Sequence, residues 1–192
     1  MSKNTLLISP ATIKNRTGVA GNIDEKLLYP EIKTAQDMFI LPVLGSALFE
    51  RLQNGIDDND LTNDEKDLLD NYITDALLYF VLAELPMGLN FQFYTKGVVQ
   101  KTGENTQQPT MSDLLDVADR YKSRAEFYSE RLIKHLRYEV STNNKFPQYL
   151  ENYTFEQMKP AQNGYTCSID LGNGYPRHMT REEKYQGKTG LC

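Results

Sequence analysis

Apolar residues recur at helical spacing along most of the chain, and this pattern predicts a mainly α protein. The clearest example is residues 22–52, where two apolar stripes are separated by Pro42 and Gly45, so we expect two helices with a break between them. Asn22 and Glu25 have the spacing of a capping box, which predicts that the first helix begins just after Asn22. Nothing in this stretch indicates chemistry, so we expect both helices to serve packing.

Two longer helices are predicted further along the chain. The first spans residues 64–85, with Thr62 and Glu65 as its capping box, and Pro86 is expected to end it. Its last turns are apolar on almost every side, which predicts burial inside the domain or against another subunit. The second follows Ser112, which is predicted as its N-cap, ends near Val140 and carries apolar residues close to heptad spacing.

The hydrophobic period changes near residues 89–101, where alternating residues and the turn signal Lys96-Gly97 predict a β-hairpin. Residues 1–21 form an N-terminal arm. Residues 159–192 form an extended C-terminal tail, which from Tyr175 onward carries too little apolar surface to fold alone. The sequence therefore predicts a helical domain over residues 22–158, a bundle of about four helices with a β-hairpin insertion.

The composition narrows the possible functions. The formal net charge of −5 argues against a protein whose main role is to coat nucleic acid, although it is compatible with a local basic patch. The two cysteines, Cys167 and Cys192, do not form a disulfide framework and are expected to be free thiols. We find no signal peptide and no apolar run of the length of a membrane span, so we expect a soluble protein made in a cytoplasm.

Candidate chemistry is weak throughout the sequence. The acidic run over residues 57–65 lacks the glycine and glutamate positions of an EF-hand loop, so we interpret it as a solvated loop. Cys167 and His178 lack an orienting third group, and His135 is expected to be a structural helix residue. We therefore predict no catalytic residue, no cofactor site and no metal site, and we expect that the protein is not an enzyme.

A set of short segments resembles a known family. They are Ile32-Lys33-Thr34-Ala35-Gln36-Asp37, Ile40-Leu41-Pro42-Val43-Leu44-Gly45, Leu48-Phe49-Glu50, Asn90-Phe91-Gln92-Phe93, Lys96-Gly97-Val98-Val99, Glu104-Asn105-Thr106 and Arg124-Ala125-Glu126-Phe127-Tyr128 with Arg131-Leu132, followed by Asn144, Phe146, Pro147 and Tyr149. In this order they resemble the head-to-tail connector (adaptor, or ring) proteins of tailed bacteriophages of the crAss-like, Bacteroides-infecting kind. The resemblance covers roughly residues 22–153 and leaves out the tail.

The resemblance implies a structural virion protein. Such proteins form rings, usually of about twelve copies, that dock on the portal, meet the next tail protein and extend the DNA channel. In such a ring subunit, the apolar faces around Leu77 to Leu85 and Tyr121 to Leu132 are expected to be shared between the core and a neighbouring subunit. Genomic DNA passes without sequence-specific contacts, and no cofactor or membrane is involved. The expected location is the capsid–tail junction of a virion assembled in the host bacterial cytoplasm. The alternative from the residues alone is a non-catalytic helical module that binds and regulates another protein.

Overall fold

The computed structural model describes residues 4–94, 97–100, 109–150 and 158–161 of the chain. The mainly α prediction is confirmed. The helical elements are α1 (Pro10–Arg16), α2 (Glu25–Ala35), η1 (Gln36–Ile40), α3 (Leu41–Leu44), α4 (Ser46–Asp57), α5 (Asn63–Leu68), η2 (Leu69–Ile73), α6 (Thr74–Asn90), α7 (Met111–Asn143) and η3 (Pro147–Leu150). η1 and η2 are π-helical turns, so α2–η1–α3 and α5–η2–α6 are two continuous helices, each with a widened turn.

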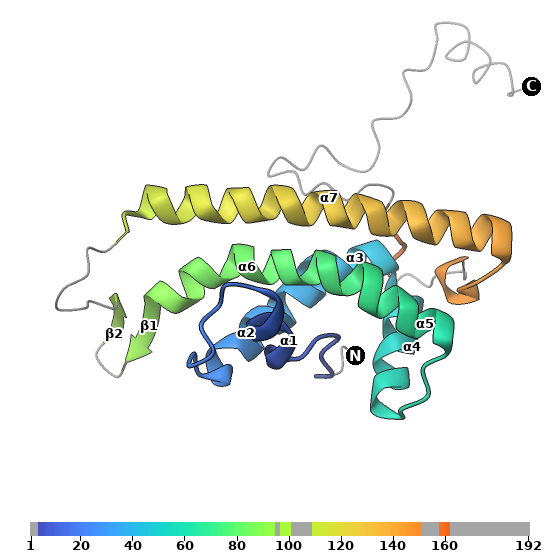
Figure 1. Cartoon of the computed structure of the whole chain (residues 1–192), viewed down its shortest axis with the longest axis horizontal. Coiled ribbons are helices and arrows are strands. Elements are labelled where there is room, and N and C mark those ends of the chain that lie inside the picture. The colour runs from blue at the N-terminus through green and yellow to red at the C-terminus, as the bar shows by residue number, and fades with distance from the viewer. Residues whose placement is uncertain (1–3, 95–96, 101–108, 151–157, 162–192) are drawn as a thin grey trace, which may run out of the picture.

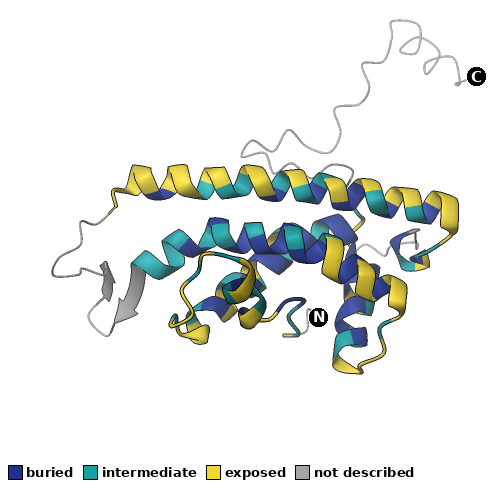
Figure 2. Ribbon diagram, viewed as in Figure 1, coloured by how far each residue is buried: buried dark blue, intermediate teal, exposed yellow. Residues whose placement is uncertain are grey.

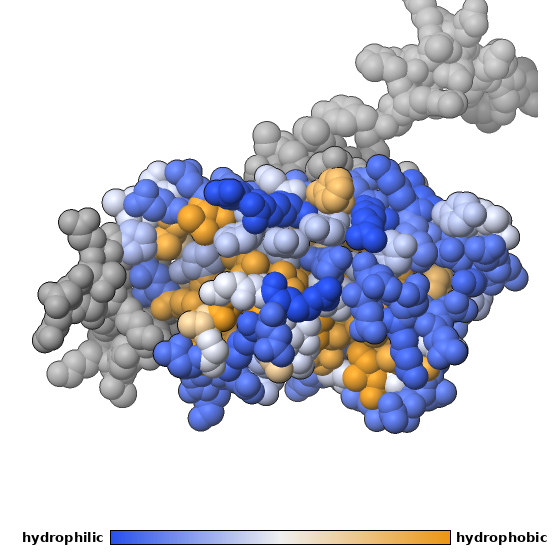
Figure 3. Space-filling model, in the orientation of Figure 1, coloured by the Kyte–Doolittle hydropathy of each residue, from blue (hydrophilic) through white to orange (hydrophobic). Residues whose placement is uncertain are grey.

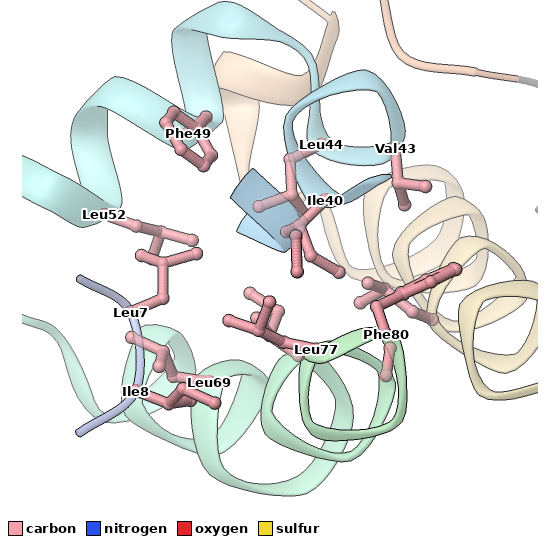
Figure 4. Close-up of a cluster of buried hydrophobic side chains, with 14 of the residues drawn as sticks. Leu7, Ile8, Ile40, Val43, Leu44, Phe49, Leu52, Leu69, Leu77 and Phe80 are labelled. Carbon is pink, nitrogen blue, oxygen red and sulfur yellow. The ribbon is translucent and has the colours of Figure 1, made fainter. Parts of the chain in front are cut away.

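α6 is the central helix of the molecule. α7 packs along one side of it, and α2 and η1 pack against it from another direction (Figure 1). Figure 4 shows Leu7 and Ile8 of the N-terminal arm beside Leu69, with Leu77 of α6 near them in the same cluster. Phe80 adds an aromatic contact, because its ring stacks on Phe39 with centroids 4.3 Å apart. One core therefore joins the arm to the long helices.

The N-cap residues in the structure can be compared with those predicted from the sequence. The capping box of Thr62 and Glu65 is confirmed, since each side chain bonds the backbone N–H of the other residue. The cap predicted at Asn22 is wrong: Asp24 is the N-cap of α2 and accepts a hydrogen bond from the Lys26 N–H. The cap of α7 is likewise Thr110 rather than residue 112. In both places several capping residues stand close together, and local spacing alone did not select between them.

Two prolines do not act as expected. Pro42 does not break the chain, because it lies in the first turn of α3, directly after the π-turn; the break is at Gly45 alone, with φ of 76°. Pro86 does not end its helix, since α6 continues to Asn90. A proline removes one N–H from a helix. We attribute the tolerance of this loss at Pro86 to tertiary packing, because the neighbouring Leu85 is buried in the core.

Two short strands follow α6. β1 (Phe91–Tyr94) and β2 (Gly97–Gln100) pair antiparallel, with Phe91 opposite Gln100. The predicted turn residue Lys96 lies outside the described residues.

Residues 158–161, where the helical domain is predicted to end and the C-terminal tail to begin, contact the helical core. The Met158 N–H donates to Ser46 Oγ at 2.8 Å, and the Ala161 N–H donates to the Pro42 carbonyl oxygen at 2.7 Å. These bonds connect the tail to the corner between α3 and α4. Residues 162–192, with Cys167, His178 and Cys192, are outside the described part of the chain.

Candidate interaction surfaces

Two buried glutamines bind the N-terminal arm. Gln36 lies in η1 and Gln53 in α4, and their exposed fractions are 0% and 1%. The Leu7 N–H donates to Gln36 Oε1 at 2.8 Å, and both glutamine Nε2 groups donate to the Thr5 carbonyl oxygen, at 3.1 and 3.0 Å. Because buried amides need hydrogen-bond partners, the arm is a structural part of the domain. The sequence signal for this was two glutamines on otherwise apolar helix faces.

An apolar groove lies beside the bound arm. Its volume is about 440 Å³, and it lies between the arm, Tyr29 of α2 and the connection from α4 to η2. The lining is mostly hydrocarbon: Leu6, Leu7, Ile8, Pro10, Tyr29, Ile56, Leu61 and Leu69. Lys66 and Asp70 are its charged members. This lining suits an apolar segment of another molecule better than a polar substrate.

A second apolar surface lies at the start of α7. Met111 is 51% exposed and Leu115 is 50% exposed, and their four-residue spacing places both side chains on one face of the helix. This end of α7 is at the left of Figure 1, on the side of the molecule where β1 and β2 lie, whereas α4 and α5 are at the right. Figure 3 shows hydrophobic patches separated by hydrophilic surface on the face in view. Clustered apolar side chains that remain exposed are typical of contact sites.

Other apolar faces are used within the monomer. Leu77 and Leu85 of α6 are buried, as are Ala125 and Leu132 of α7. These residues come from the two faces, near residues 77–85 and 121–132, that the sequence suggested as shared between the core and a neighbouring subunit. Their burial leaves little of these faces for a partner, so the groove and the start of α7 are the better candidates.

A pair of acidic side chains lies between α2 and α6. Burial of the Glu31 carboxyl, and secondly the neighbouring Glu84 carboxylate, raises the pKa of Glu31. Gly88 makes room for this carboxyl, since a Cβ at this glycine would overlap Glu31 Oε1. The pair lies on a helix–helix contact, away from the apolar groove, and we assign it a structural role.

Metal chemistry has no support in the described part of the chain, where no cluster of three or more His, Cys, Asp or Glu side chains could hold an ion. In the acidic run that suggested calcium, Asp60 and Glu65 pair with Arg51 at 3.5 and 2.9 Å. Glu65 also caps α5. The predicted absence of catalytic, cofactor and metal residues stays a prediction, and Cys167 and His178 lie outside the described residues.

One helix passes a simple test for a membrane span. By length and composition alone, the continuous helix Asn63–Asn90 is long and apolar enough to cross a membrane. The expectation that no apolar run reaches the length of a membrane span is therefore wrong. Of the apolar 18-residue segment of this helix, 50% is buried inside the domain. Because α6 is packed by both α2 and α7, its apolar character is that of a central core helix.

Comparison with known proteins gives one match. The model of a family of unknown function, DUF6712, matches residues 40–157, which is more than half of the chain. No curated protein and no solved structure matches the chain. The matched region begins at Ile40, the last residue of η1, and includes the central helix α6 and the long helix α7 that packs along it, whereas α2 lies before it.

Proposed function

The chain belongs to DUF6712, a family of unknown function, and we propose that it is a structural subunit of a phage head-to-tail connector ring. In this proposal each copy docks on the portal, contacts the next tail protein and extends the DNA channel. It performs no catalysis and works in the virion at the capsid–tail junction. The proposal combines the resemblance of the short segments with the surfaces described above.

The observation that carries the proposal is the presence of two unlike apolar surfaces. The groove beside the arm is concave and includes Ile56 and Leu61, whereas the start of α7 presents protruding side chains such as Met111 and Leu115. The start of α7 is at the left of Figure 1, whereas the groove is lined by the arm and α2 near the middle and by residues of α4 and α5 toward the right. A symmetric dimer needs one self-complementary patch, whereas a ring needs two different patches that join head to tail. Two unlike patches therefore favour a ring.

The central helix pair also suits a ring subunit. α6 and α7 run side by side for much of their length (Figure 1). Packed helices of this kind give a stiff body, because interiors packed at crystal-like density deform little. A stiff body with two separate contact surfaces can keep a constant angle between neighbours, and a closed ring requires a constant angle.

Negative-stain electron microscopy of the full-length protein tests the proposal. The protein is imaged alone and after mixing with the portal protein of the same phage. Rings with an open centre in either sample are the expected result, and their symmetry gives the copy number. Small uniform particles in both samples would reject the connector.

The second candidate is a non-catalytic helical module that binds an apolar peptide. The groove of about 440 Å³ beside the arm is the observation that favours it. This candidate predicts a monomer or dimer in both microscopy samples, so the same experiment separates the two functions.

A further inference from the structure

The solvent side of α7 carries a regular line of basic and aromatic residues, the α7 stripe: Arg120, Arg124, Phe127, Arg131, Lys134 and Tyr138. Steps of four and three residues place these side chains on one face of the helix. All six are exposed, and the ribbon of α7 in Figure 2 is yellow, the colour of exposed residues, at many positions along its outer side. The opposite face of the helix holds buried core residues such as Ala125 and Leu132.

Positive charge is concentrated on the α7 stripe although the whole chain has a net charge of −5. The stripe contains four cationic residues and no acidic one. The guanidinium group of Arg131 lies 4.8 Å from the centre of the Tyr72 ring, and its Nη1 atom lies 3.7 Å from Asp75 Oδ2. Within the described residues, no carboxylate lies within ion-pair distance of the Arg120 or Lys134 side chains. The stripe therefore keeps cationic groups available to a polyanion.

We propose that the α7 stripe binds the sugar–phosphate backbone of double-stranded DNA. From Arg120 to Tyr138 the helix rises about 27 Å, at about 1.5 Å per residue, which approaches the ~34 Å helical turn of a duplex. The binding surface is the outer, convex face of one helix, and an α-helix fits the major groove or lies against its phosphates. Single-strand sites instead combine a cationic groove with stacking aromatics. The convex shape therefore favours a duplex.

This inference rests on the proposed function, because a ring would present one stripe per subunit to the DNA in its channel. The stripe contains no side chain of the two apolar contact surfaces, so subunit contacts and DNA contacts use different residues. Phosphate contacts carry no sequence information, which fits a surface along which genomic DNA of any sequence passes.

The test is fluorescence anisotropy of a labelled DNA duplex of mixed sequence with the full-length protein, over a range of salt concentrations. Four phosphate contacts predict a slope of about −3.6 for log K against log salt. The variant Arg120→Gln/Arg124→Gln/Lys134→Gln is expected to bring this slope about 2.7 closer to zero, at about 0.9 per contact. The matched control Arg16→Gln/Lys26→Gln/Lys159→Gln removes the same charge from exposed positions off the stripe and outside the groove, and it should keep the original slope.

Three results would overturn the inference. The first is an equal change of slope in the stripe variant and the control variant, which would indicate a net-charge effect. The second is no binding of duplex by the unchanged protein. The third is preferred binding of a single strand that falls about tenfold in Phe127→Ala, as expected for base stacking.

Electron microscopy of the stripe variant separates this inference from the proposed function. Rings of the variant that no longer bind duplex support both statements. If the unchanged protein forms rings but the stripe and control variants have equal slopes of log K against log salt for the duplex, only the DNA surface is rejected. If the slopes are as predicted but no rings form, either from the protein alone or with the portal protein, only the connector proposal is rejected.

Discussion

The ring of Tyr72 in η2 stacks on the imidazole of His135 in α7, with centroids 3.8 Å apart and planes at 8°. The guanidinium group of Arg131, one turn earlier on α7, lies 4.8 Å from the centre of the same Tyr72 ring. The π-helical turn brings Tyr72 into contact with two successive turns of α7. His135, which the sequence predicts to be a structural helix residue, therefore joins the two longest helices.

Acidification is expected to weaken the fold through His135. Burial lowers the pKa of His135; Glu139 and Asp67 act in the opposite direction, and Lys145 and Arg131 add to the lowering. The unfolded chain therefore takes up the proton first. Stability from the neutral imidazole is complete above the ordinary pKa of about 6.5 and is lost as pH falls through it toward the folded-state pKa.

Urea unfolding at several pH values between 7.5 and 5 measures this effect. The variant His135→Phe can keep a ring stacked on Tyr72 but has no group that titrates, so its midpoint should change less over this range. The same pH dependence in both proteins would show that other groups are responsible.

The acidic pair Glu31 and Glu84, between α2 and α6, predicts the opposite dependence of stability on pH. Because burial and Glu84 raise the pKa of Glu31, the charged carboxylate costs stability at neutral pH, and this cost disappears as pH falls through the raised pKa. Glu31→Gln is therefore expected to be more stable than the unchanged protein at pH 7, with the difference shrinking toward pH 4. Thermal unfolding at both pH values measures it, with the exposed Glu50→Gln as control. Equal effects of the two substitutions would contradict the assignment.

The hydrogen bonds of the N-terminal arm predict that the substitution of one buried glutamine strongly lowers the free energy of unfolding. Gln36→Ala leaves the Leu7 N–H without its acceptor and removes one of the two donors to the Thr5 carbonyl. An unsatisfied buried group costs about 1–3 kcal/mol, so we expect a loss of about 2–4 kcal/mol once the lost packing is included. Urea unfolding measures it, and the exposed Thr34→Ala is the control. A loss below about 0.5 kcal/mol would mean that the arm is not held by this contact.

Periodic features of the fold were predictable from the sequence, and long-range polar contacts were not. The long helices follow from their apolar stripes, and the Thr62–Glu65 cap follows from local spacing. The role of Gln36 depends on a partner 31 residues earlier in the chain, which no local pattern shows. Pro86 looked like a stop signal because its effect on a helix is local. The α7 stripe was present in the sequence, but only the structure shows that its opposite face is buried.

The break after α3 depends on one glycine. Gly45 has φ of 76° and ψ of 159°, a conformation essentially restricted to glycine. Gly45→Ala is therefore expected to cost about 1–3 kcal/mol. Gly18→Ala is the matched control, because no atom lies within 4 Å of its added Cβ. Differential scanning calorimetry of both variants measures the difference, and equal melting temperatures would show that the backbone at Gly45 relaxes without cost.

The start of α7 predicts a variant that separates assembly from folding. Leu115 is 50% exposed, so Leu115→Glu should change the free energy of unfolding by less than about 0.5 kcal/mol. In the proposed ring the same side chain meets a neighbouring subunit, where an unpaired charge is costly to bury. We expect Leu115→Glu to elute as a monomer in size-exclusion chromatography with light scattering, whereas the exposed Asp119→Asn assembles like the unchanged protein. Rings of normal size from Leu115→Glu would exclude this end of α7 from the subunit contact, and the groove beside the arm would have to meet a different surface.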